Sequence, residues 1–209
     1  MDLLKKCALS FHVLLEYEYH FVIGRKGKLR EFRLGFDMAD FHHLAGLHKL
    51  KDIAQIQQGM RERIFEKILS GNISMDLIEK SSYYSQMSGR ILPLAGLEQF
   101  LDDNQMIFRY NERVHKFSMI KADYLLEGKA NINPSYLFLG ARNHDEKEQM
   151  CRTFFRIEDK DYTEGQPKYT LLKKEKIHLP TGKILVQFDK LSNKEVKKQD
   201  IGQKQFNTI

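Results

Sequence analysis

Residues 3–36, LLKKCALSFHVLLEYEYHFVIGRKGKLREFRLGF, change their hydrophobic period halfway along, and this change decides the fold class. Over 3–15 the apolar residues lie three and four positions apart, which predicts an amphipathic helix. Over 17–23 they alternate, and the turn-forming GRKGK of 24–28 precedes a second strand-like run over 29–36. We therefore predict a helix followed by a β-hairpin with a basic tip.

Helical patterning continues over 37–104 before strand-like patterning takes over. Asp37 is placed to cap the first of these helices, a single amphipathic segment covers 53–68, and Pro93 lies close to the start of a later helix. Further strands are predicted at 106–110, 118–126, 135–140, 151–157, 168–178 and 183–188. Short connections favour antiparallel neighbours, so we predict an α+β fold: an N-terminal helix and hairpin, central helices and a C-terminal antiparallel meander sheet.

Length and composition set broad limits on the class of protein. The 209 residues include 34 Lys+Arg and 28 Asp+Glu, a formal net charge of +6 that permits a polyanionic partner without requiring one. We expect a single domain over 1–188 and a polar, frayed tail over 189–209. No window of 18 apolar residues and no apolar leader occurs, which predicts a cytoplasmic protein without a membrane span. The oligomeric state is left open.

Several chemistries lose support from missing motifs. Two cysteines, Cys7 and Cys151, are too few for a disulfide framework or a four-cysteine zinc site. The sequence contains no GxxxxGK[ST] loop, GxGxxG motif or GxSxG elbow, which argues against nucleoside triphosphatases, dinucleotide enzymes and α/β-hydrolases.

The densest polar stretch is DFHHLAGLHK, residues 40–49, which holds three of the eight histidines. On one continuous helix His42 and Lys49 would lie within about 20° of each other, whereas His43 and His48 would point in other directions. Metal ligands paired on one helix usually lie at i and i+4, a spacing absent here, so we expect no metal and no cofactor. His43 and His48 are then either core-edge residues held by hydrogen bonds or acid–base groups.

Other polar residues are open to two readings. Gly46 leaves room for a ligand or for another backbone. Arg142 can clamp a phosphate or be solvated, and Lys121 is a lone lysine in a predicted strand. Arg152 and Arg156 flank aromatic residues, which suits either a single-stranded RNA surface or the outer face of a sheet.

Alternation in the strand at 151–157 predicts which side chains share a face. It places Cys151, Thr153 and Phe155 on one face and Arg152, Phe154 and Arg156 on the other.

Several short motifs together resemble one group of nucleases. They are FHHLAGLHKL (41–50), IEKSSYY (78–84) with Arg90-Ile91, IKAD (120–123), YLFL (136–139) and TFF (153–155). The set resembles PBECR4, the phage and mobile-element group of the barnase–EndoU–colicin E5/D–RelE nucleases, over most of 1–190. The resemblance implies helices packed on an antiparallel sheet and a metal-independent ribonuclease activity.

The resemblance also singles out individual positions. It gives most weight to His43 with Gly46, and further weight to Ser82 and Arg90 in the middle helices and to Lys121 and Thr153 in the sheet. The family pattern has serine before the paired phenylalanines, so Thr153 keeps the hydroxyl but departs from the pattern.

This activity would need little beyond proton transfer and positive charge. RNA supplies its own nucleophile, the 2′-hydroxyl, so cleavage needs a base, an acid and cations around the phosphate. We predict that His43 or His48 transfers protons, that Lys49, Lys121 and Arg142 stabilise charge, and that Thr153 positions the phosphate. The residues predicted to contact RNA are His42, Arg90, Arg142, Arg152 and Arg156.

The expected partner is RNA, single-stranded or in a structured loop, and an inhibitor protein is a further candidate. One alternative is a catalytically inactive phage or mobile-element protein that binds RNA or a protein through the same scaffold. Another is a small structural or adaptor protein whose histidines are simply buried.

Overall fold

The computed structural model describes residues 2–115, 118–131 and 133–192. The tail predicted over 189–209 therefore lies outside the described residues from 193 onward. The helices are α1 (Leu3–Leu14), α2 (Met38–Leu44), α3 (Ala54–Gln57), α4 (Arg61–Leu69), α5 (Met75–Ile78), α6 (Ser88–Leu94) and α7 (Leu97–Asp102), with 3-10 turns η1 (Leu47–Lys49), η2 (Tyr84–Gln86) and η3 (Glu112–Val114). The strands are β1 (Tyr17–Arg25), β2 (Lys28–Leu34), β3 (Met106–Arg109), β4 (Tyr124–Ala130), β5 (Asn133–Arg142), β6 (Asp145–Arg156), β7 (Lys168–His178) and β8 (Lys183–Asp189).

The change of period near residue 16 is confirmed as a change from helix to strand. Helix α1 buries its apolar stripe, and Asp2 caps it by accepting a hydrogen bond from the Lys5 backbone N–H. Strands β1 and β2 are joined by Lys26 and Gly27, both with positive φ. This two-residue turn matches the right-handed twist of the strands that it joins.

Two of the predicted helices differ from the structure. The segment predicted over 53–68 consists of two helices, α3 and α4, which are separated by residues 58–60. The helix predicted to begin near Pro93 also divides in two, and Pro93 lies in the last turn of α6 instead. Gly96 is the N-cap of α7, which begins at Leu97, and the apolar periodicity therefore continues across a break in the helical backbone.

The sheet is a closed barrel and not a simple meander. Within the described residues, seven strands form a ring in the order β1–β2–β6–β5–β4–β3–β7, which closes because β7 also pairs with β1. Strands β3 to β6 do form the predicted antiparallel meander, but β2 and β6 pair in parallel, and β8 adds to β7. Hydrophobic alternation identifies a strand but not the distant strand that pairs with it, so the sequence does not predict the pairing of β7 with β1 that closes the barrel.

One predicted strand begins later than expected. The segment 118–126 enters the sheet only at Tyr124. Asp123 accepts a hydrogen bond from the Ala141 backbone N–H and forms an ion pair with Arg109. Lys121 consequently lies in a loop before β4, not in a strand.

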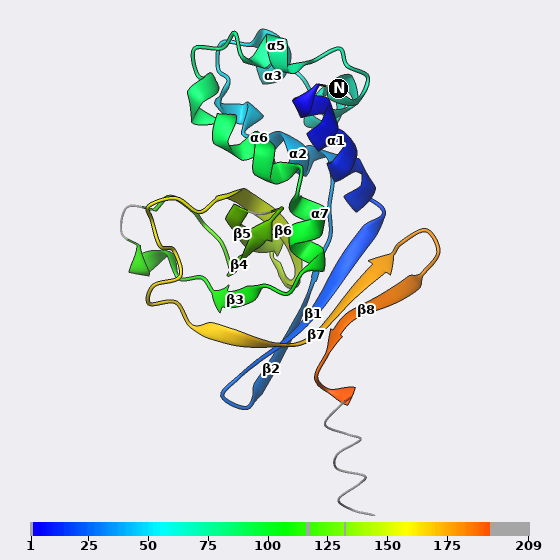
Figure 1. The fold of residues 1–209 in the computed structure, drawn as a ribbon, viewed down its shortest axis with the longest axis vertical. Helices are drawn as coiled ribbons and strands as arrows, with labels where there is room; N and C mark the ends of the chain where they lie inside the picture. The colour runs from blue at the N-terminus through cyan, green and yellow to red at the C-terminus, as the bar shows by residue number, and fades with distance from the viewer. Residues whose placement is uncertain (1, 116–117, 132, 193–209) are drawn as a thin grey trace, which may run out of the picture.

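The helices gather against one end of the barrel, as Figure 1 shows. A continuous apolar core joins the inner faces of α1, α2 and α6 to the barrel interior, and a second cluster around Phe138 lies separately. Helices α2 and α6 both pack on β6, while α7 packs on β4. Polar residues of α2, α6 and β6 are thereby brought together. None of the described helices has the length and apolarity needed to cross a membrane.

Candidate active site

The polar stretch 40–49 does not form one helix. Asp37 and Asp40 form a reciprocal capping box at the start of α2, which confirms the predicted N-cap, but α2 ends at Leu44. Gly46 then adopts φ +77°, a left-handed conformation that glycine adopts without a steric penalty, and η1 follows. The expectation that His43 and His48 point in different directions is wrong, because it assumed a continuous helix. Their rings stack with centroids 4.4 Å apart and planes 14° apart.

Gly46 also lets α6 approach closely. A Cβ at this position would lie 2.9 Å from the Met87 Cβ and 3.0 Å from the Arg90 Cδ, which is too near for an ordinary contact. Of the two predicted uses of Gly46, room for a ligand or for another backbone, the structure shows the second, because α6 packs against this glycine. The approach places the Arg90 side chain beside the histidine pair, and its Nη1 donates a 2.8 Å hydrogen bond to the Thr153 Oγ1.

Strand β6 contains a bulge at Arg152. Cys151 lies opposite Leu139 and Thr153 lies opposite Phe138, so one extra residue is inserted between them. Leu139 and Phe138 are consecutive residues of β5, so their side chains face opposite sides of the sheet. Because paired residues share a side, Cys151 and Thr153 also face opposite sides. The predicted face shared by Cys151, Thr153 and Phe155 is therefore wrong for Cys151.

The bulged Arg152 lies across the neighbouring strand at a glycine. A Cβ at Gly140 would be 2.5 Å from the Arg152 Nε, so any other residue here would force the Arg152 side chain to move. The Arg152 Nη2 donates to the Ala141 carbonyl at 3.1 Å. Arg152 is also close enough to His43 for its charge to lower the pKa of that ring.

These contacts define a histidine–arginine cluster. Its members come from α2, η1, α6 and β6, and they are His43, His48, Lys49, Arg90, Arg152 and Thr153. The Lys49 ammonium donates to the Gln86 carbonyl at 2.7 Å. Within the part of the chain that the structure describes, no carboxylate forms an ion pair with Lys49, Arg90 or Arg152.

Burial and excess positive charge lower the pKa values of the cluster. Burial and then Arg90 lower the pKa of His43, although its side chain is exposed at the surface. Burial and then His43 lower the pKa of His48 to about 4. The pKa of Lys49 is lowered by burial and then by Arg90. Both imidazoles are therefore neutral at neutral pH, and neutral imidazole can accept a proton.

The other predicted site residues lie elsewhere. His42 is buried, and burial followed by Arg61 lowers its pKa. Arg142 forms a 2.7 Å ion pair with Asp40, so its guanidinium is partnered within the protein. Arg156 is exposed at the end of β6.

Ser82 and Lys121 are also outside the cluster. The Ser82 hydroxyl and backbone N–H both donate to Asp52, at 2.9 and 2.8 Å, which ties the two loops together. Lys121 lines a cavity of about 900 Å³ together with Arg152, whereas His43 and Thr153 do not line it.

Sequence reasoning missed two contributors. Arg61, at the start of α4, lowers the pKa of both His42 and His43, and the Gln86 carbonyl holds Lys49. No local spacing links either residue to the histidines, because they approach only when α4 and η2 pack.

Among the residues for which the structure gives positions, no group of three or more His, Cys, Asp or Glu side chains could hold a metal ion.

A family model described as phage-Barnase-EndoU-ColicinE5/D-RelE like nuclease 4, PBECR4, matches residues 3–191. No curated protein and no solved structure matches the chain.

Proposed function

The chain belongs to the PBECR4 family of phage-Barnase-EndoU-ColicinE5/D-RelE-like nucleases, and from this premise we propose that it cleaves RNA without a metal ion. In the proposed reaction the 2′-hydroxyl of one nucleotide attacks the adjacent phosphorus and the 5′-oxygen of the next nucleotide leaves. The observation that carries the proposal is the stacked His43–His48 pair beside the Arg90–Thr153 hydrogen bond.

His43 is the proposed general base. It is the exposed member of the histidine pair, so a 2′-hydroxyl can approach it, and its lowered pKa keeps the ring neutral at neutral pH. His48 stacks against it and fixes the orientation of the ring. A base held in this way removes the 2′-hydroxyl proton as the oxygen attacks.

Lys49 is the proposed acid for the leaving group. A lowered pKa makes its ammonium a stronger acid than an ordinary lysine, and the bond to the Gln86 carbonyl holds it in place. Transfer of this proton to the 5′-oxygen balances the proton that His43 takes. The products are a 2′,3′-cyclic phosphate and a 5′-hydroxyl end.

Arg90, Arg152 and Thr153 are proposed to hold the phosphate. Charge accumulates on the non-bridging oxygens as the 2′-oxygen attacks, and guanidinium groups stabilise such charge through directed hydrogen bonds. The absence of a carboxylate partner for either arginine among the described residues supports this assignment. Arg142 is left out of the proposed site because Asp40 already binds its guanidinium.

The test is cleavage of labelled single-stranded RNA by the purified protein in EDTA. We expect products with 2′,3′-cyclic phosphate ends, and a loss of about 10²–10⁴ in rate for His43→Ala, the usual contribution of one proton-transfer group. His12→Ala is the matched control, since His12 is an exposed histidine on α1 outside the cluster. Intact RNA after long incubation at high protein concentration, or equal rates for the two variants, would contradict the proposal.

A further inference from the structure

The cavity of about 900 Å³ that Lys121 and Arg152 line shares only Arg152 with the histidine–arginine cluster, and its other lining residues have no part in the proposed chemistry. It is formed by the end of β3 and η3, by the loop before β4, by the end of β5 and by the middle of β6. Its volume lies within the range of about 300–1,000 Å³ that is usual for sites holding small organic ligands. A nucleotide is of this size class.

The charges that line the cavity favour an anion. Four cations line it, Arg109, Arg113, Lys121 and Arg152, against the two carboxylates of Glu112 and Asp123. Asp123 is already engaged, because one of its oxygens pairs with Arg109 at 3.1 Å and the other accepts from the Ala141 N–H at 2.8 Å. Within the described residues, neither Arg113 nor Lys121 forms an ion pair.

Arg152 connects this cavity to the cluster. Its side chain passes over Gly140 and lines the cavity, and the next residue in β6 is Thr153, whose Oγ1 accepts the hydrogen bond from Arg90. In a strand whose scissile phosphate lies between His43 and Arg152, the neighbouring nucleotide would therefore lie beyond Arg152, in the cavity. Lys121 and Arg113 line the same cavity as Arg152.

From this geometry we infer that the cavity is a subsite for the RNA strand next to the cleavage position, in which Arg113 and Lys121 bind backbone phosphates. The inference rests on the proposed function in taking RNA as the ligand. It moves Lys121 from the chemical step to strand binding and adds Arg113, which the sequence did not single out. Since phosphate contacts carry no base information, the subsite contributes affinity and not base preference.

The test is binding of a labelled twelve-nucleotide single-stranded RNA, measured by fluorescence anisotropy over a range of salt concentrations. All proteins carry His43→Ala so that binding is measured without cleavage. Each phosphate contact on a single strand contributes about 0.7 to the slope of log affinity against log salt. We expect Arg113→Gln/Lys121→Gln to lower this slope by about 1.4 and to weaken binding about tenfold at moderate salt, equally for two unrelated RNA sequences.

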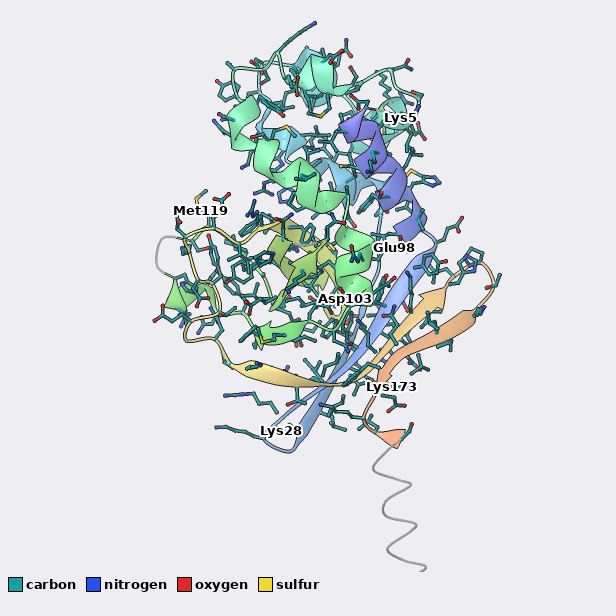
Figure 2. All side chains as sticks on the ribbon, in the orientation of Figure 1. Lys5, Lys28, Glu98, Asp103, Met119 and Lys173 are labelled. Carbon is teal, nitrogen blue, oxygen red and sulfur yellow. The ribbon has the colours of Figure 1, made fainter. Side chains whose placement is uncertain are left out.

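The matched control is Arg25→Gln/Lys28→Gln, which removes the same two kinds of charge at the hairpin tip. Figure 2 shows Lys28 at this tip, well away from Met119, which lies two residues before Lys121. An unchanged slope for the cavity variant, or an equal loss for the control, would overturn the inference. If the cavity variant melts at a lower temperature, the single variants are measured instead, each with an expected loss of about 0.7 in slope.

The same experiment separates this inference from the proposed function. In the His43-containing protein we expect the cavity variant to raise KM while kcat stays unchanged, because neither residue touches the reacting atoms. If the protein does not cleave RNA but the cavity variant shows the expected change in the slope of log affinity against log salt, the nuclease proposal is contradicted and the subsite is supported. If instead the protein cleaves RNA and the wild type and the cavity variant have the same KM, the subsite inference is overturned and the nuclease proposal is supported.

Discussion

Two groups of charged side chains, one at α7 and one between α2, α6 and β6, differ in how their cations are partnered. In the α7 charge network, defined as Tyr19, Glu98, Asp102, Lys174 and Lys176, the Lys176 ammonium binds Glu98 at 2.8 Å and Asp102 at 3.0 Å. The fully buried Lys174 donates to the carbonyls of residues 101, 102 and 103, at the end of α7. Figure 2 marks this short helix by Glu98 and Asp103.

The histidine–arginine cluster contrasts with this network in its unbalanced charge. Its cations donate to a hydroxyl or to backbone carbonyls, and burial lowers the pKa values of His43, His48 and Lys49. A buried cation is tolerated where the protein itself supplies the opposite charge or several acceptors. The comparison teaches that the α7 network serves stability, whereas the cluster has the unmatched positive charge that an anionic substrate would neutralise.

The largest effect should come from breaking the α7 network at its buried lysine. Lys174→Met removes the donor to three carbonyls, and we expect a loss of roughly 3 kcal/mol in the free energy of unfolding. Urea denaturation followed by circular dichroism measures it. The neighbouring Lys173→Met is the control, because Lys173 is more exposed than Lys174 and pairs with Glu175, and we expect this variant to lose less than about 1 kcal/mol. Equal losses for the two variants would show that the bonds of Lys174 do not stabilise the fold.

We expect Gly46→Ala to have a smaller effect on stability and also to disturb the histidine–arginine cluster. Gly46→Ala forces an alanine into a left-handed conformation, which costs about 1–2 kcal/mol, and its Cβ collides with Met87 and Arg90. Gly27→Ala is the matched control, since Gly27 has φ +76° but no atom within 4 Å of a built Cβ. We expect both variants to lose stability and only Gly46→Ala to lose RNA cleavage. Cleavage that survives in both would mean that the position of Arg90 is unimportant.

Stability should also depend on pH, through the histidine pair. Because the pKa of His48 is about 4 in the folded protein and near 6.5 when unfolded, the unfolded chain binds a proton that the folded chain does not. Stability should therefore fall as the pH drops from about 6.5 towards 4, with His43 adding in the same direction. Melting temperatures of wild type and His48→Gln over this range measure the effect. A His48→Gln protein with an equally steep decline would show that His48 is not the group responsible.

The helix at 3–14, the hairpin and most later strands could be predicted because each is encoded by local spacing of apolar residues. The two interruptions of helical structure, at residues 58–60 and after Pro93, could not be predicted, because the apolar period continues through both of them. The sequence alone singled out all six residues of the cluster: His43, His48, Lys49, Arg90, Arg152 and Thr153. Their arrangement in space could not be predicted, because it depends on the left-handed conformation of Gly46 and on the bulge at Arg152.

The amino-acid sequence by itself determined the α+β order of elements and which polar residue types occur in the helical and sheet halves. Tertiary structure alone decided that β7 closes the barrel onto β1, that His43 and His48 stack, and that Arg142 pairs with Asp40 while Arg90 reaches Thr153. The physical reason is that periodicity records which face of an element is apolar, a local property. The neighbours of that face are chosen by the simultaneous packing of segments that are distant along the chain.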